Sequence, residues 1–354
     1  SMVGKVGSEK DVPLLAICHT TQKAQIEIII DEHGNFKMAR IVPKGQDRTI
    51  IPCTEDSGGR TRGEAPHPLC DKLQYVARDY KKFGGDKDTY YDSYLKQLAE
   101  WGSSLYSHVK VQSVLKYVKK GNVIKDLVDN KILEVDEKNI LLGKQEKKKN
   151  VVTFGGIQAD AFVRWEVEIP NDICSKVWED KTLWENWIQY YSNLKKIKTL
   201  CYVTGNELLV AEQHPAKIRN DGDKAKLISS NDWSGFTFRG RFTDTKEFNT
   251  YQTCGVGFEV TQKAHSALRW LISRQGYISG DQAIVVWATS GKRIPDPLSD
   301  PLSILGENGL PSDEEIVNYT AQNLALKLKQ KIAGYKVDLG TTDGIVVIGL
   351  DSAT

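Results

Sequence analysis

Runs of apolar and β-branched residues, separated by polar turns, predict the strands of the chain. Residues 25–31 (QIEIIID) and 36–42 (FKMARIV) are two such runs, and residues 32–35 (EHGN) between them tolerate a left-handed turn. Together these stretches predict an opening antiparallel hairpin. Similar patterns predict strands at residues 162–169, 282–288 and 344–350. Residues 200–205 are predicted to form a strand that ends in a turn.

Apolar residues spaced three and four positions apart predict helices in much of the remaining chain. The spacing is clearest at residues 105–119, where six apolar side chains keep mostly to one helical face. Residues 177–191 carry Trp178, Trp184 and Trp187, which could form a platform for stacking bases. Their spacing is more typical of a packed core face. The other predicted helices are residues 69–80, 89–101, 122–133, 260–274 and 312–332.

Strands and helices are mixed without a regular βαβ alternation, so we predict an α+β fold with antiparallel or mixed sheets and flanking helices. Residues 1–145 are expected to form an N-terminal lobe and residues 146–354 a second lobe, although the two could be one continuous domain. Residues 52–68 (PCTEDSGGRTRGEAPHP) show no period and predict a long irregular loop, a place where functional contacts are common.

The composition indicates a folded, cytoplasmic protein. The 354 residues are 40% hydrophobic, which is enough for substantial cores, and no apolar run is long enough to predict a membrane span or a signal peptide. Six scattered cysteines are typical of reduced thiols. The net charge of +2 conceals an uneven distribution, because residues 295–354 hold four lysines against nine acids. The preceding part is therefore more basic and could meet phosphates.

Two sets of cysteines and histidines are candidates for catalysis and for metal binding. Cys201 with His214 offers a thiol and a base for a cysteine-dependent hydrolase, but Cys201 lies in an apolar run where unreactive cysteines are common. Cys53, His67 and Cys70 could approach a metal, yet only the last two have a ligand-like spacing. We therefore expect no enzyme, metal or cofactor, and keep the hydrolase as the alternative.

Two irregular segments are candidates for nucleic-acid binding. Residues 60–82 and 214–241 each hold six lysines or arginines against three acids, together with polar groups that can bind phosphates and base edges. The same composition also describes ordinary solvated loops, so residue types alone leave both interpretations open.

Six stretches resemble a known family and occur in that family's order. The chain resembles the large subunit of the type I-C CRISPR interference complex, Cascade, which reads the protospacer-adjacent motif. Members of the family are longer and end in a helical portion, so the resemblance implies that the chain corresponds to the N-terminal body without it. The matching stretches are residues 60–76 (RTRGEAPHPLCDKLQYV), 201–205 (CYVTG), 211–219 (AEQHPAKIR), 227–231 (LISSN), 251–252 (YQ) and 280–288 (GDQAIVVWA).

The resemblance implies a DNA-binding subunit without catalytic residues of its own. Its partners would be double-stranded target DNA, the guide RNA, the backbone and guide-processing subunits of Cascade, and a recruited nuclease-helicase, with no membrane. The subunit would recognise the motif in duplex DNA and help to start pairing between guide and target in antiviral defence.

The resemblance and the two basic segments together give the expected site residues. The expected phosphate contacts are Arg60, Arg62, Lys72, Lys217, Arg219, Lys224 and Lys226. The expected readers of the motif are His67, Ser230, Asn231 and Gln252.

Overall fold

The computed structural model divides the chain into two compact units. Unit 1 comprises Ser1–Glu9, Pro13–Lys217 and Lys226–Ser266, and unit 2 comprises Lys10–Val12, Ile218–Ala225 and Ala267–Thr354. The structure describes residues 3–4, 12–60, 64–86, 89–143, 157–228, 255–288 and 345–351. Among these residues, helices are combined with small antiparallel and mixed sheets, which confirms the predicted α+β class.

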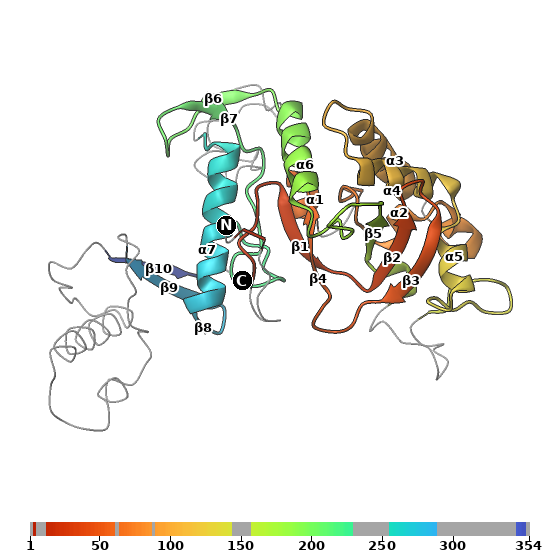
Figure 1. The fold of residues 1–354 in the computed structure, drawn as a ribbon. Helices are drawn as coiled ribbons and strands as arrows, with labels where there is room; N and C mark the ends of the chain where they lie inside the picture. The colour runs from red at the N-terminus through yellow and green to blue at the C-terminus, as the bar shows by residue number, and fades with distance from the viewer. Residues whose placement is uncertain are drawn as a thin grey trace. The chain divides into compact units, whose positions relative to one another are not determined.

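A three-stranded sheet lies at the centre of unit 1. Its middle strand, β2 (Ile26–Asp31), pairs antiparallel with β3 (Phe36–Ile41) and parallel with β5 (Val163–Glu168), as Figure 1 shows. The predicted hairpin and the strand after residue 161 are thereby confirmed. Because β2 and β5 come from opposite sides of residue 145, one sheet joins chain segments from both predicted lobes.

The turn between β2 and β3 contains the left-handed backbone conformation that was expected at residues 32–35. An oxygen of the Asp31 carboxylate accepts hydrogen bonds from the backbone N–H groups of His33 and Asn35. Gly34 has a φ of 72°, and a Cβ at this position would lie 2.7 Å from the carbonyl oxygen of Ser113. Glycine is therefore required here both by the backbone conformation and by the close approach of a helix.

A second sheet of unit 1 was missed by the sequence analysis. β1 (His19–Lys23) pairs antiparallel with β4 (Arg48–Pro52), and the short helix α1 (Glu55–Gly58) follows. The sequence of β1, HTTQK, lacks the apolar alternation that marks a strand, so only its pairing with β4 identifies it. Within the expected irregular loop of residues 52–68, residues 61–63 lie outside the described residues.

The helices of unit 1 cover the sheet, and α4 packs against β2 and β5. The predicted helix at residues 69–80 is instead two short turns, since Ala77 between them has an extended backbone. The Trp-rich helix begins only after Asp180, whose carboxylate caps the N–H groups of Thr182 and Leu183. The helices are α2 (Leu73–Val76), η1 (Arg78–Phe83), α3 (Thr89–Gly102), α4 (Val109–Lys120), α5 (Val123–Asp129), η2 (Gln158–Asp160) and α6 (Lys181–Leu194).

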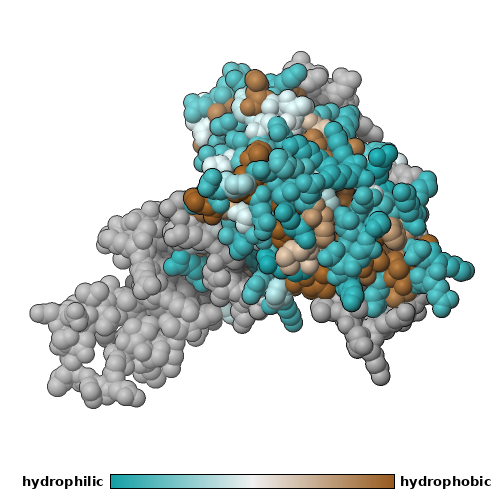
Figure 2. Space-filling view, turned by 45° about the vertical axis from the view of Figure 1, so that its right-hand side comes forward, coloured by the Kyte–Doolittle hydropathy of each residue, from teal (hydrophilic) through white to brown (hydrophobic). Residues whose placement is uncertain are grey.

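Three fully buried tryptophans, Trp101, Trp165 and Trp187, form the centre of the unit 1 core. The indole nitrogen of Trp187 donates to the backbone carbonyl of Cys18 at 3.1 Å, which ties α6 to the residue before β1. Trp178 and Trp184 belong to the same buried cluster, which confirms the core interpretation for all three tryptophans. Outside the core, hydrophilic side chains cover most of the described surface in Figure 2, with smaller hydrophobic patches between them.

The remaining elements follow residue 197. The hairpin β6 (Lys198–Leu200) and β7 (Glu207–Leu209) belongs to unit 1, and α7 (Phe258–Gln275) contains residues of both units. No helix among the described residues is both long and apolar enough to cross a lipid bilayer. The predicted helix at residues 312–332 lies outside the described residues. Unit 2 contains an antiparallel sheet in the order β10-β9-β8, with β8 (Tyr277–Ser279), β9 (Gln282–Ala288) and β10 (Ile345–Leu350).

Candidate nucleic-acid interface

Arg60, an expected phosphate contact, turns inward. Its Nη1 and Nη2 atoms donate to the two carboxylate oxygens of Asp71 at 2.8 and 2.6 Å, and Nη1 also donates to the carbonyl of Ala65. Its guanidinium lies over the ring of Tyr75, 4.5 Å from the ring centroid. Asp71 is fully buried. The donors of Arg60 thus hold a buried carboxylate, so we leave this residue out of the proposed DNA contacts.

His67, an expected reader of the motif, is also buried, with 1% of its surface exposed. Its Nε2 lies 3.3 Å from Nε2 of Gln22, and its ring meets that of Phe162 edge-on. Burial lowers the pKa of His67 well below its usual value, and the positive charges of Arg60 and Lys217 lower it further, so the ring is neutral at pH 7. A buried ring cannot reach a base edge, and we leave His67 out of the proposed readers.

Lys72 is the expected contact of the first segment that stays at the surface. Its Nζ lies 2.8 Å from Oδ1 of Asp160, and both side chains are more than one third exposed. An exposed pair of this kind contributes little to stability, so the ammonium can exchange its carboxylate for a phosphate at low cost. Arg62 lies outside the described residues.

The second segment contributes Lys217 and Lys226 to unit 1. Both lysines are partly exposed, and Lys217 has an unusual positive φ of 65°. Nζ of Lys226 donates to Oε1 of Gln213 at 3.3 Å. Burial lowers the pKa of Lys226, while the nearby acids Glu55 and Asp56 oppose that shift. Both lysines are therefore partly within the fold, with some surface left for a partner.

Two expected contacts of unit 2 differ in their surroundings. Arg219 donates through Nε and Nη2 to both oxygens of Asp223, at 2.9 and 3.0 Å, and through Nη1 to the carbonyl of Asp281. These hydrogen bonds lower the pKa of Asp223 to about 2. Lys224 is exposed, and its ammonium has no ion pair among the described residues. Of these two cations, Lys224 is the one available to a phosphate.

The expected readers Ser230, Asn231 and Gln252 lie outside the described residues. Their proposed role therefore stays a prediction.

Cys201 and His214, the pair of the hydrolase alternative, have separate partners. Burial opposes ionisation of the Cys201 thiol, but hydrogen bonds from the Gly257 backbone and from Thr204 lower its pKa to about 7. The Gly257 nitrogen lies 3.2 Å from Cys201 Sγ. His214 is buried, with Nδ1 2.8 Å from the hydroxyl of Thr261. Within the described part of the chain, no three potential metal ligands gather at one point.

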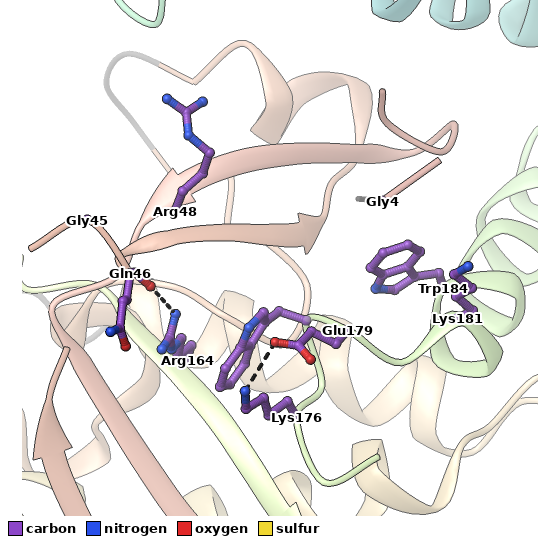
Figure 3. Close-up of a pocket in the computed structure, with 10 residues that line it drawn as sticks. Gly4, Gly45, Gln46, Arg48, Arg164, Lys176, Glu179, Lys181 and Trp184 are labelled. Carbon is purple, nitrogen blue, oxygen red and sulfur yellow. Dashed lines mark hydrogen bonds and ion pairs between the residues drawn. The ribbon is translucent and has the colours of Figure 1, made fainter. Parts of the chain in front are cut away.

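A basic pocket that the sequence analysis did not identify opens on unit 1 (Figure 3). Its volume is about 480 Å³. Two tryptophans and four cations surround it, with one acid. The lining residues are Gly4, Gly45, Gln46, Arg48, Arg164, Lys176, Trp178, Glu179, Lys181 and Trp184.

Arg164 forms a fixed wall of the basic pocket. Its Nε and Nη2 atoms donate to the carboxylate of Glu27, and its Nη1 donates to the backbone carbonyl of Gln46 at 2.9 Å. The guanidinium carbon lies 3.9 Å from the ring centroid of Trp178. These contacts restrain both the cation and the indole. The sequence signal was the stretch KVWEDKTLW at residues 176–184, which alternates lysines with tryptophans.

The comparison with known families agrees with the motifs found in the sequence. The model of the family described as CRISPR-associated protein (Cas_Csd1) matches residues 3–354. No curated protein matches the chain. The match confirms the inferred family of CRISPR-associated large subunits. Because it spans nearly the whole sequence, the chain belongs to the Cas_Csd1 family of CRISPR-associated proteins.

Proposed function

We propose that the chain is the DNA-binding large subunit of a type I-C Cascade complex. In this role it recognises the protospacer-adjacent motif in duplex DNA and helps to start pairing between guide RNA and target. The observation that carries the proposal is the family match over residues 3–354. Its partners are the other Cascade subunits, the guide RNA and a recruited nuclease-helicase, and it acts in the cytoplasm.

Exposed cations support the DNA-binding part of the proposal. Lys72 in unit 1 and Lys224 in unit 2 each present an ammonium at the surface. Lysines of this kind bind phosphates without regard to sequence, which gives a subunit general affinity for duplex DNA. Neutral polar side chains such as Asn231 and Gln252 are then proposed to discriminate between base pairs, as amides can in either groove.

A non-catalytic role agrees with the contacts of the two candidate catalytic residues. Cys201 accepts its hydrogen bond from Gly257, and His214 pairs with Thr261. A thiol enzyme would use the imidazole to accept the thiol proton. We therefore propose that both side chains stabilise the fold. In the Cys201→Ser variant, unchanged DNA and partner binding would support this role, whereas loss of a hydrolytic turnover would favour the enzyme.

The test measures duplex binding by the assembled complex at two salt concentrations. The subunit carries either the wild-type sequence or Gln252→Ala with Asn231→Ala, and the targets contain or lack the cognate motif. We expect affinity to fall only for the cognate target, by about 1 to 3 kcal/mol for each lost base contact. Unchanged discrimination between the two targets would remove these residues from motif reading.

Lys224→Ala provides the contrasting variant. It should weaken binding to both targets alike and reduce the slope of log K against log salt by about 0.9 for the lost phosphate contact. Lys96→Ala is the matched control, because Lys96 is exposed on α3 and lacks an ion pair among the described residues. Equal effects of the two lysine variants would show that Lys224 contributes only general charge.

A further inference from the structure

We propose that the basic pocket binds one unpaired nucleotide of a single-stranded nucleic acid, with its phosphate near Lys181 and Lys176 and its base beside the tryptophan edges. The inference goes beyond the proposed function, which concerns duplex DNA and other residues. It depends on four properties of the pocket: its volume, its charge, a buried donor without an acceptor, and its rigid aromatic wall.

The volume of the basic pocket suits a nucleotide. Sites for organic ligands usually enclose about 300 to 1,000 Å³, and the basic pocket encloses about 480 Å³. An inorganic anion would leave most of this space empty. The pocket is too small for both bases of a pair. The base that enters must therefore be unpaired, as in enzymes that flip a base out of the duplex.

The charge of the basic pocket favours a phosphate. Lys181 is exposed at the first position of α6 and has no ion pair among the residues that the structure describes. Lys176 faces Glu179 at 3.3 Å, and both are more than 40% exposed, so this contact is weak. Figure 3 shows the same contact as a dashed line at the edge of the pocket. Two ammonium groups are thus available to an incoming phosphate.

Trp184 supplies a buried donor that has no hydrogen-bond partner among the described residues. Only 4% of this residue is exposed, and its indole Nε1 has no hydrogen-bond partner within the described part of the chain. Buried N–H groups are rarely left without an acceptor in native proteins. Because Trp184 lines the basic pocket, a phosphate or base oxygen bound there can accept this hydrogen bond. The unused donor therefore indicates a ligand that carries acceptors.

The aromatic wall favours a planar ring over a flexible acidic chain. Trp178 is held by the Arg164 guanidinium at 3.9 Å, and Trp184 contacts the ring of His19 at a centroid distance of 5.5 Å. Side chains restrained in this way present ordered apolar edges without further loss of entropy on binding. Aromatic side chains combined with cations are the usual means of binding single strands without sequence preference.

The first measurement uses the full chain and fluorescently labelled twelve-nucleotide probes of single-stranded RNA, single-stranded DNA and duplex DNA. Lys181→Ala should weaken binding of at least one single strand by about tenfold and lower its salt slope by about 0.7. Lys96→Ala, which removes another exposed ammonium from α3, should change it less than twofold. The strand with the larger loss, RNA or DNA, identifies the source of the nucleotide.

A second variant tests the indole donor. Trp184→Phe keeps a ring but removes the N–H group. We expect its affinity for single strands to be two- to tenfold lower than that of the wild type. The melting temperature of each variant is measured to exclude unfolding. Should Trp184→Phe not fold, Lys176→Ala replaces it, and we expect the same direction of change.

Three results would overturn the proposal. The first is that Lys181→Ala and Lys96→Ala weaken binding of single strands equally. The second is that Lys181→Ala weakens binding of duplex DNA as much as binding of single strands. The third is that inorganic phosphate competes with the probe as effectively as a mononucleotide does. The outcome is independent of motif recognition, because the probes lack a cognate motif and the assembled complex is not used. Failure of this proposal therefore leaves the proposed function untouched.

Discussion

Arg60 and Lys181 are both cations beside aromatic residues, yet the fold uses them in opposite ways. Arg60 is almost buried, and both of its terminal nitrogens contact the carboxylate of Asp71. Lys181 is exposed at the edge of the basic pocket, and no carboxylate pairs with it among the described residues. The difference teaches that the position of the counter-charge, and not the cation itself, decides whether a basic residue stabilises the fold or can bind a ligand.

Arg164 combines both situations. It lines the basic pocket, but its guanidinium is bound to the buried carboxylate of Glu27. The pocket thus contains one neutralised cation, Arg164, that positions Trp178, and one exposed cation, Lys181, that has no ion pair among the described residues. Four variants can test this division between fold and ligand.

The largest effect is expected for Arg60→Ala. Removal of the guanidinium leaves the charge of Asp71 buried without its partner, which should lower the free energy of unfolding by about 3 to 5 kcal/mol. Urea unfolding at pH 7 measures the change. The control is Lys181→Ala, which removes the exposed cation. Its free energy of unfolding should stay within about 0.5 kcal/mol of the wild-type value. Similar values for the two variants would remove the distinction between them.

Glu27→Gln should have the second largest effect. The substitution retains the shape of the side chain but weakens its hydrogen bonds with Arg164 and Arg40. Hydrogen bonds to charged groups contribute about 1.5 to 3 kcal/mol, and we expect a loss of that size in urea unfolding. Fluorescence of the tryptophans should also change, since Arg164 would no longer be fixed against Trp178. A stable variant with unchanged fluorescence would contradict the role of Glu27.

The Arg219–Asp223 pair of unit 2 is a further cation bound to a carboxylate, and its contribution to stability should depend on pH. The pKa of Asp223 is about 2 in the folded protein, below its usual value near 3.8, so its ionised form stabilises the fold. This contribution is present above pH 4 and is lost as the pH falls toward 2. Relative to Asp223→Asn, the wild type should be more stable by about 1 to 2 kcal/mol at pH 7. Urea unfolding should show the same advantage at pH 7 and pH 5 and a smaller one at pH 3.

The smallest effect on stability is expected for Glu179→Gln at the basic pocket. Its exposed contact with Lys176 should contribute less than about 0.5 kcal/mol. Binding of a single strand should instead tighten by roughly two- to fivefold, because a negative charge leaves the edge of the pocket. The assay is the one used for Lys181→Ala. Weaker binding of the strand by this variant would argue against a phosphate at this edge.

Strong periodicity made parts of the fold predictable. The hairpin β2–β3, the helix α3 and the strand β9 were all found within a residue or two of their bounds, because each carries a sustained apolar pattern. The predicted helix at residues 69–80 was wrong, because Leu69 has a left-handed φ of 70° and Ala77 has an extended backbone. The Asp79 carboxylate accepts hydrogen bonds from the N–H groups of Ile124 and Lys125 at the start of α5, a contact that local propensity cannot reveal.

The candidate site was less predictable, since the sequence shows cations but not their counter-charges. Asp71 lies only eleven residues after Arg60, yet nothing in the pattern indicated that the two would be buried together. Glu27 lies 137 residues before Arg164, so only the parallel pairing of β2 with β5 brings them into contact. The core interpretation was correct for Trp178, Trp184 and Trp187, and the first two also line the basic pocket.

The parallel pairing of β2 with β5 has a consequence during synthesis. Val163, the partner of Ile26, leaves the ribosome 137 residues later, which takes roughly 7 to 27 seconds at usual elongation rates. Until then, the edge of β2 that pairs with β5 has no partner strand. The isoleucines of β2, which are buried in the folded protein, lie beside this edge. Such an edge is a template for aggregation, so the nascent chain is exposed to aggregation until β5 has been made.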